Sequence, residues 1–197
     1  MSRIGILSLQ GDVSEHIMAM ENAIKITGIN ANVVSVNSKK DFPIDALVIP
    51  GGESTTIGKL LVKTGLYSEI KKLAKNNVPI MGTCTGLILL AKKGDDEVKK
   101  TKQPLLKLMN IKVNRNAFGR QRESFETDLE IPIIGKKPFH GVFIRAPLIE
   151  EIWGGVKILS RLDKKIVMAQ QGNILAIAFH PELTSDTRVH EYFLNLI

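Results

Sequence analysis

The chain has 197 residues, of which 44% are hydrophobic and 24% are charged, so it can bury the core of one globular domain over residues 1–197 rather than two. Its single cysteine excludes an internal disulfide, the absence of a signal-peptide pattern points to a cytoplasmic protein, and no apolar stretch is long enough to predict a membrane span. The net charge of +7 comes with lysines in scattered pairs without interleaved aromatic residues, so nucleic acid is not an expected partner.

Strand and helix patterns alternate in the first part of the chain. The first helix has clear signals: Asp12 and Glu15 have capping-box spacing, Gly28 follows its last turn, and one apolar stripe is formed by Val13, Ile17, Met20 and Ile24. In chain order we expect a strand at 4–9, a helix at 12–27, strands at 31–36 and 46–49, helical patterns at 60–74, a strand at 78–81 and a helix at 87–93. This alternation predicts a parallel sheet covered by helices.

Strand patterns dominate the second half of the chain. Residues 92–104 are charged and nearly free of large apolar side chains, which is typical of a surface excursion. Beyond them we expect strands at 108–113, 125–134, 141–144, 156–160, 166–169 and 174–179, and a last helix at 185–196. The predicted fold class is a three-layer α/β domain, with a mostly parallel central sheet flanked by helices and extra antiparallel strands in the second half.

Cys84 is the first candidate for chemistry. It lies in Gly82-Thr83-Cys84-Thr85-Gly86, between an apolar strand and an apolar helix. This is a cysteine version of the Gly-x-Ser-x-Gly turn that exposes a nucleophile, and the positive end of the following helix favours a thiolate over a thiol. A free cysteine is equally often a small buried hydrophobe, so a base must be found to decide between the two interpretations.

A base is offered by the turn Phe179-His180-Pro181-Glu182, which closes a buried strand pattern. Glu182, two residues on in extended chain, can project to the same side as His180 and orient its imidazole. Taken alone, the pair reads as a bonded histidine with a surface acid. Together with Cys84 it predicts a Cys-His-Glu triad, which geometry rather than chain order defines.

Two further turns follow predicted parallel strands, at 10–12 and 50–56. Ligands gather at the carboxyl ends of such strands, and the paired Gly51 and Gly52 free backbone N–H groups to face a ligand or an oxyanion. The remaining histidines, at positions 16, 140 and 190, suit surface or packing roles. One cysteine and four dispersed histidines give no zinc spacing, so we expect no metal and no cofactor.

Six short segments carry a family resemblance. The segments 51–56, 82–86 and 179–183 resemble those of class I, triad-type glutamine amidotransferases. More narrowly, the glutaminase subunits of pyridoxal 5'-phosphate synthases are resembled by Leu7-Ser8-Leu9-Gln10-Gly11-Asp12, Arg115-Asn116-Ala117-Phe118-Gly119-Arg120-Gln121 and Phe143-Ile144-Arg145-Ala146-Pro147. The likeness runs from the first strand to the last helix and implies the flavodoxin-like fold of class I glutaminases.

The resemblance also implies a reaction. In it Cys84 attacks the side-chain amide of L-glutamine, ammonia leaves, and water hydrolyses the γ-glutamyl thioester to glutamate, with His180 moving the protons and Glu182 orienting it. Backbone N–H groups of Gly52 and Thr85 are the implied oxyanion hole. The implied glutamine-binding residues are Gly52, Glu53, Ser54, Arg115, Ile144 and Arg145. An arginine suits the substrate carboxylate, although Arg115 could also be an exposed loop residue and Arg145 could act through its backbone.

The implied partner is a separate synthase subunit that uses the ammonia to assemble the pyridoxal ring, in a large hetero-oligomer where glutaminase activity stays low until the partner docks. We expect the loop at Gln10 to couple docking to the oxyanion hole. Two other classes share such a cysteine turn. A non-catalytic or stress-related protein commonly has histidine directly after the cysteine, where this chain has Thr85, and a γ-glutamyl hydrolase is usually larger and secreted.

Overall fold

The computed structural model describes residues 1–115 and 124–197, and their main feature is a ten-stranded mixed sheet. Its strand order is β2-β1-β3-β4-β12-β11-β9-β6-β5, and β10 pairs with β11 beside this path. A separate two-stranded sheet pairs β7 with β8. Of the motif at 115–121, only Arg115 lies within the described residues.

Five strands form the parallel half of the sheet. Most of their residues are fully buried and apolar, as is usual for strands covered on both faces. These strands are β1 (Ser2–Leu7), β2 (Ala31–Val36), β3 (Ala46–Ile49), β4 (Ile80–Thr83) and β12 (Ile174–Ile177). Although β12 comes late in the chain, it pairs in parallel with β4 and so occupies the middle of the sheet.

The other half of the sheet is largely antiparallel, as predicted for the second half of the chain. In it β12 pairs with β11 (Lys165–Gln171), which also pairs with β10 (Lys157–Leu162) and with β9 (Leu148–Ile152). Beyond β9 come β6 (Met109–Asn114) and, parallel to it, β5 (Ala91–Lys93). The small sheet consists of β7 (Ser124–Leu129) and β8 (Phe139–Ile144).

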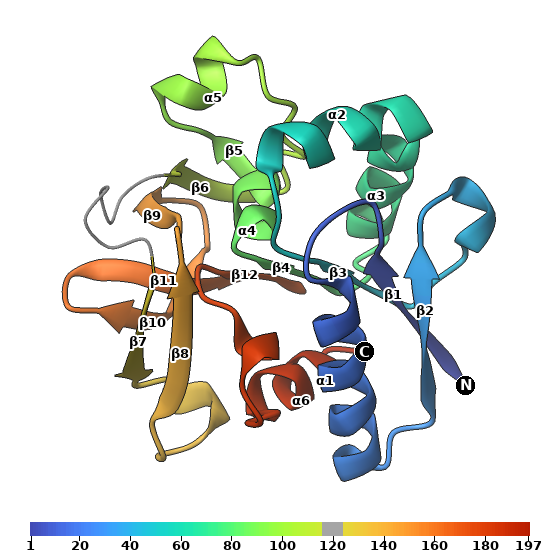
Figure 1. Ribbon diagram of the computed structural model, residues 1–197, viewed down its shortest axis with the longest axis vertical. Coiled ribbons are helices and arrows are strands. Elements are labelled where there is room, and N and C mark those ends of the chain that lie inside the picture. Colours follow the sequence, from blue (N-terminus) through green and yellow to red (C-terminus); the bar gives the residue numbers. More distant parts are fainter. Residues whose placement is uncertain (116–123) are drawn as a thin grey trace.

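Helices lie on both sides of the sheet (Figure 1), which confirms the predicted three-layer α/β class. On one side are α1 (Val13–Thr27) and α6 (Arg188–Leu194), and on the other are α2 (Ser54–Thr64) and α3 (Leu66–Lys75). The shorter helices are α4 (Thr85–Leu90) and α5 (Asp96–Lys100), with 3₁₀ turns at Lys39–Asp41 (η1), Pro132–Ile134 (η2) and Pro181–Leu183 (η3). Within the described ranges, every helix is too short or too polar to cross a bilayer.

Several predicted boundaries were wrong. The helix expected at 87–93 ends at Leu90, and the next three residues form β5. The helical region begins at Ser54 and is divided by Gly65, whose φ of 75° ends α2 in the left-handed conformation. The charged excursion contains α5, because the Asp95 side chain accepts a hydrogen bond from the Val98 backbone N–H and caps the helix.

The second half differs from the prediction in two strands and in the last helix. The strand expected at 125–134 stops at Leu129, and Pro132, which has no backbone N–H to donate, begins η2. The strand β9 was not predicted, although its first two residues are buried in the sheet. The last helix spans only Arg188–Leu194, so residues 185–187 and 195–196 of the predicted range lie outside it.

The first helix also differs from its predicted pattern. Its buried residues are His16, Ala19, Met20 and Ala23, so the inner face is rotated from the predicted apolar stripe. The side chain of Asp12 makes no capping hydrogen bond, which corrects the predicted capping box. The fully buried rings of His16 and His190 meet edge to face with centroids 5.9 Å apart, which joins α1 to α6.

The buried His190 predicts an acid-sensitive fold. Burial lowers its pKa to about 4, whereas the unfolded side chain titrates near 6.5. The unfolded state therefore binds more protons between these values, and the free energy of unfolding should fall by about 3 kcal/mol as the pH drops from 6.5 to 4 through this group. Urea titrations should show a smaller loss over this window for His190→Phe. A control, His140→Ala, removes an exposed histidine whose pKa is raised by the hydrogen bonds that it donates to Glu126 and Asp128, and should leave the loss in place.

The strand register brings four turns to one edge of the parallel half. Ile6 pairs with Val48, Ile49 pairs with Gly82, and Thr83 pairs with Ile177. The four strands therefore end nearly level with one another. The residues that follow β1, β3, β4 and β12 meet at this edge, where ligands bind in sheets of this kind.

Candidate active site

Cys84 stands at the turn between β4 and α4, as predicted. Its φ of 49° and ψ of −103° are unusual for a residue with a side chain and mark a strained turn. A Cβ on Gly86 would lie 2.2 Å from the Ile49 carbonyl oxygen, and a Cβ on Gly82 would lie 2.6 Å from the Gly86 carbonyl carbon. Both glycines are therefore required by the close approach of strand and helix. The sulfur lies 3.9 Å from the Ile144 carbonyl oxygen.

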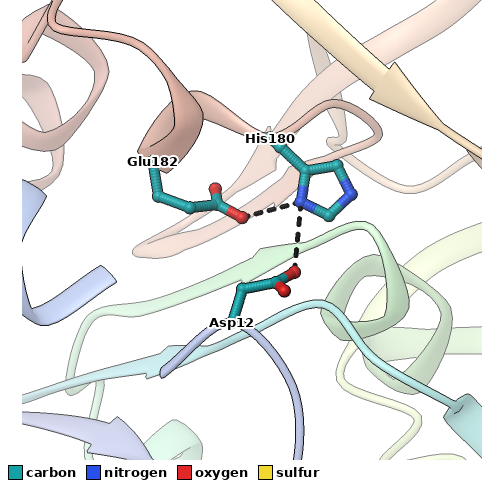
Figure 2. A group of neighbouring side chains, drawn as sticks. All are labelled: Asp12, His180 and Glu182. Atoms are coloured by element: carbon teal, nitrogen blue, oxygen red, sulfur yellow. Dashed lines mark hydrogen bonds and ion pairs between the residues drawn. The ribbon is translucent and has the colours of Figure 1, made fainter. Parts of the chain in front are cut away.

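His180 and Glu182 form the predicted pair, but through a different local structure. The backbone N–H of His180 donates to the Val142 carbonyl at 2.8 Å, and η3 follows at once, so the chain is not extended here. The His180 Nδ1 lies 2.7 Å from Glu182 Oε1 (Figure 2). His180 Nε2 is buried without a hydrogen-bond partner among the described residues. The ring is thus held at one nitrogen and available at the other.

Burial and charge oppose each other in this pair. Burial alone would lower the pKa of His180, but Cys84 and Glu182 favour the charged imidazolium and raise that pKa to about 10. Burial raises the pKa of Glu182, whose side chain is fully enclosed, and His180 acts against this effect. An imidazolium beside a cysteine sulfur is an arrangement that can activate the sulfur as a nucleophile.

Asp12 joins the site from the start of α1, which sequence reasoning missed. Its Oδ2 lies 3.5 Å from His180 Nδ1 (Figure 2), and a Cβ on Gly51 would lie 2.8 Å from both that oxygen and His180 Cε1. The possible ligand atoms of Asp12, His180 and Glu182 lie within 4.8 Å of one another, close enough to hold one metal ion. However, the bond between His180 and Glu182 already uses one atom of each.

The glycine turn after β3 packs against the two neighbouring turns. The Thr85 hydroxyl donates to the Gly52 carbonyl, which ties this turn to the residue after the nucleophile. Gly52 has a φ of 144°, a conformation that residues with side chains rarely adopt. The backbone N–H of Glu53 donates to Gln10 Oε1 at 3.3 Å. The loop after β1 is therefore in direct contact with the turn that was predicted to hold the oxyanion.

A cavity of about 520 Å³ collects nearly all the predicted site residues. Glu182 does not line it, because it lies behind His180. The lining residues are Gln10, Asp12, Gly52, Glu53, Ser54, Cys84, Thr85, Ile88, Arg115, Ile144, Arg145 and His180.

Gln103 organises one end of this cavity and was not predicted. Its Oε1 accepts hydrogen bonds from Ser54 Oγ at 3.1 Å and from Arg115 Nη1 at 2.8 Å. Arg115 also lies near Asp95, with 3.6 Å between its Nε and Oδ1, so it is a partly buried, anchored residue and not an exposed loop arginine. Glu53 caps α2 by accepting from the Thr55 and Thr56 backbone N–H groups. Burial alone would raise the pKa of Glu53, but hydrogen bonds from the side chains and backbone N–H groups of Thr56 and Thr55 lower it to about 2.

His16 was expected in a surface or packing role, and the surface alternative is wrong. The side chain is fully buried, with Nε2 3.3 Å from Glu182 Oε2 and 2.9 Å from Thr83 Oγ1. Its sequence signal was its spacing from Ala19, Met20 and Ala23, which places it on the inner face of α1.

Known proteins resemble this chain along almost its whole length. A protein named pyridoxal 5'-phosphate synthase subunit PdxT from Methanococcoides burtonii is 56% identical over 194 residues, which are 98% of each chain. A protein of the same name from Archaeoglobus fulgidus is 50% identical over 195 residues, again 98% of each chain.

Solved structures agree with the observed topology. A crystal structure of a glutamine amidotransferase superposes with a TM-score of 0.86 at 47% identity, covering 98% of this chain and 97% of the other. PurLQS from Thermotoga maritima, at 18% identity and a TM-score of 0.62, covers 99% of both chains and shares the fold alone. The model of the SNO glutamine amidotransferase family matches residues 6–197. The chain therefore belongs to the SNO glutamine amidotransferase family.

Proposed function

We propose that this chain is the glutaminase subunit of a pyridoxal 5'-phosphate synthase, which hydrolyses L-glutamine to glutamate and ammonia and passes the ammonia to a synthase subunit. Its relatives carry that subunit's name at 50–56% identity. One observation carries the catalytic part of the proposal. Cys84, on a strained turn, lines the same cavity as His180, whose Nδ1 is fixed by Glu182 at 2.7 Å and whose Nε2 is left available.

The proposed reaction begins with attack of the Cys84 sulfur on the amide carbon of the glutamine side chain. Collapse of the tetrahedral intermediate breaks the C–N bond, and His180 gives its proton to the departing ammonia. Water then attacks the resulting thioester while His180 takes a proton from it. The C–S bond breaks, which releases glutamate and restores the free sulfur of Cys84. Glu182 stabilises the imidazolium and keeps Nε2 directed at the reacting atoms.

The remaining cavity residues would bind the substrate. We assign the oxyanion to backbone N–H groups of Gly52 and Thr85, where loss of one donor typically costs about a hundredfold or more in rate. Arg115, which donates a hydrogen bond to Gln103 and lines the cavity with Glu53 and Ser54, would clamp the substrate carboxylate. Ile144 and Arg145 also line the cavity and would contact the substrate.

Ammonia release from L-glutamine tests this function directly. The purified chain should be assayed alone and with the synthase subunit, and a γ-glutamyl peptide should be offered in parallel. We expect ammonia and glutamate in equal amounts, release strongly stimulated by the partner, and little cleavage of the peptide. A preference for the peptide would indicate a γ-glutamyl hydrolase, and no turnover under either condition would indicate a non-catalytic protein.

Gln10 should couple the partner to catalysis within the proposed hetero-oligomer. Its side chain accepts the Glu53 N–H, so a partner that moves this loop also moves the turn carrying Gly52. Gln10→Ala should reduce partner-stimulated turnover by about tenfold, because one hydrogen bond to the turn is lost. The rate of Cys84 alkylation in the isolated chain should change much less. Unchanged stimulation in this variant would contradict the coupling.

A further inference from the structure

The Glu182 carboxylate needs more than one donor. Its side chain is fully buried, and burial raises its pKa, which favours the neutral acid. Oε1 faces His180 Nδ1 at 2.7 Å, but Oε2 is buried without a hydrogen-bond partner among the described residues. A buried carboxylate with one oxygen unsupported is costly to keep ionised and is free to rotate.

His16 is placed at that second oxygen. It projects from the inner face of α1, and its Nε2 lies 3.3 Å from Glu182 Oε2. The same nitrogen lies 2.9 Å from the hydroxyl of Thr83, the residue directly before the nucleophile. One buried imidazole nitrogen therefore touches both the acid of the proposed triad and the strand that carries Cys84.

The surroundings decide where the His16 proton sits. Burial, and then the nearby His190 and His180, lower the pKa of His16 well below 6.5, so the ring is neutral at pH 7. With its proton on Nδ1, the ring would bury a donor without a partner and turn the Nε2 lone pair toward a carboxylate. With the proton on Nε2, the ring places an N–H and not a lone pair 2.9 Å from Thr83 Oγ1 and 3.3 Å from Glu182 Oε2. The Nε2–H tautomer is the consistent one.

We propose that His16 is a positioning residue of the active site, whose Nε2–H is shared by Thr83 Oγ1 and Glu182 Oε2 and keeps the Glu182 carboxylate ionised and oriented toward His180. The inference deepens the proposed function and rests on it for its kinetic consequences. His16 does not touch the cavity, so it acts through Glu182 and not on glutamine. Its loss should change kcat and leave KM nearly unchanged.

Two substitutions of similar size separate positioning from packing. In His16→Gln the amide nitrogen can occupy the place of Nε2, whereas in His16→Asn the shorter amide nitrogen cannot reach it. We expect kcat for glutamine, measured with the synthase subunit present, to fall about tenfold or more in His16→Asn and to recover largely in His16→Gln. The acidic limb of the kcat profile should move to higher pH in His16→Asn, because Glu182 then accepts a proton more readily.

A second readout does not depend on turnover. Carbon-13 NMR of glutamate-labelled protein, assigned with Glu182→Gln, should show the Glu182 carboxyl titrating about one pH unit or more higher in His16→Asn than in the wild type or His16→Gln. His190→Phe changes the other buried histidine of this pair and does not touch Glu182, so it is the packing control and should leave both readouts in place. Thermal unfolding of every variant establishes that it is folded.

The outcomes are distinct. A kinetic loss and a shifted Glu182 titration in His16→Asn, both restored in His16→Gln, support the positioning role. Equal effects in the two variants, or an equal effect in His190→Phe, would reduce His16 to a packing residue and overturn it. If the wild-type complex released no ammonia, the proposed function would fail, and the carboxyl titration alone would still decide whether His16 supports the charge on Glu182.

Discussion

Cys84→Ala should reduce ammonia release from glutamine to the background level, a loss of about 10⁴-fold or more, because no thioester can form without the sulfur. The substitution removes one atom from a residue that is 8% exposed, so the fold should survive. Turnover is measured with the synthase subunit present, and glutamine binding by calorimetry. We expect binding to persist, since the other cavity residues remain in place.

Ser160→Ala is a matched control for this experiment. Ser160 is also buried, and its hydroxyl donates to the Glu130 carbonyl away from the cavity. This control should keep full turnover. Activity of Cys84→Ala within about tenfold of the wild type would show that another group performs the attack and would refute the proposed mechanism.

Glu182→Gln should lower kcat by about 10³-fold to 10⁴-fold, because a neutral amide neither stabilises the imidazolium of His180 nor fixes its tautomer. The variant has nearly the same shape, and it removes a buried charge whose ionisation is disfavoured by burial. The melting temperature should therefore fall little. The measurement is a full pH profile of kcat and KM, with thermal unfolding of the same samples.

Glu69→Gln makes the same change of charge on α3, where Glu69 pairs with the exposed Lys72. It should leave kcat and KM unaltered. If Glu182→Gln raised KM while kcat stayed near the wild-type value, Glu182 would act in substrate binding and not on His180, which would contradict its assigned role.

The parallel half of the fold was predicted well because its strands and turns are indicated by short stretches of sequence. Short apolar runs bounded by glycine turns indicate buried parallel strands, and such strands place their following turns at one edge. That placement predicted, before any distance was known, that Cys84 and His180 lie close together. It could not show that Glu182 reaches His180 from a 3₁₀ turn, because a histidine-proline-glutamate segment is compatible with more than one backbone path.

The roles of three other residues were not predicted, each for its own reason. Gln103 lies in a charged segment with no periodic pattern, so only the tertiary structure reveals its bonds to Ser54 and Arg115. Asp12 matched a helix cap by spacing, yet its carboxylate faces the histidine of another turn. For His16 the packing alternative holds and the surface alternative is wrong. The sequence did not decide between them because the helix was interpreted from its large apolar residues, whereas two alanines and a methionine share the inward face with His16.

The central position of β12 also bears on synthesis. A ribosome-bound chain that has not yet produced residues 174–182 already carries the proposed nucleophile, Cys84, but it lacks the proposed base, His180, and one of the two strands that pair with β4. Chains are made at about 5–20 residues per second, so the thiol is synthesised several seconds before the histidine that is proposed to activate it. Nascent chains, and chains truncated before β12, are therefore expected to consume no glutamine. Hydrolysis is expected to begin only after β12 has paired with β4 and β11.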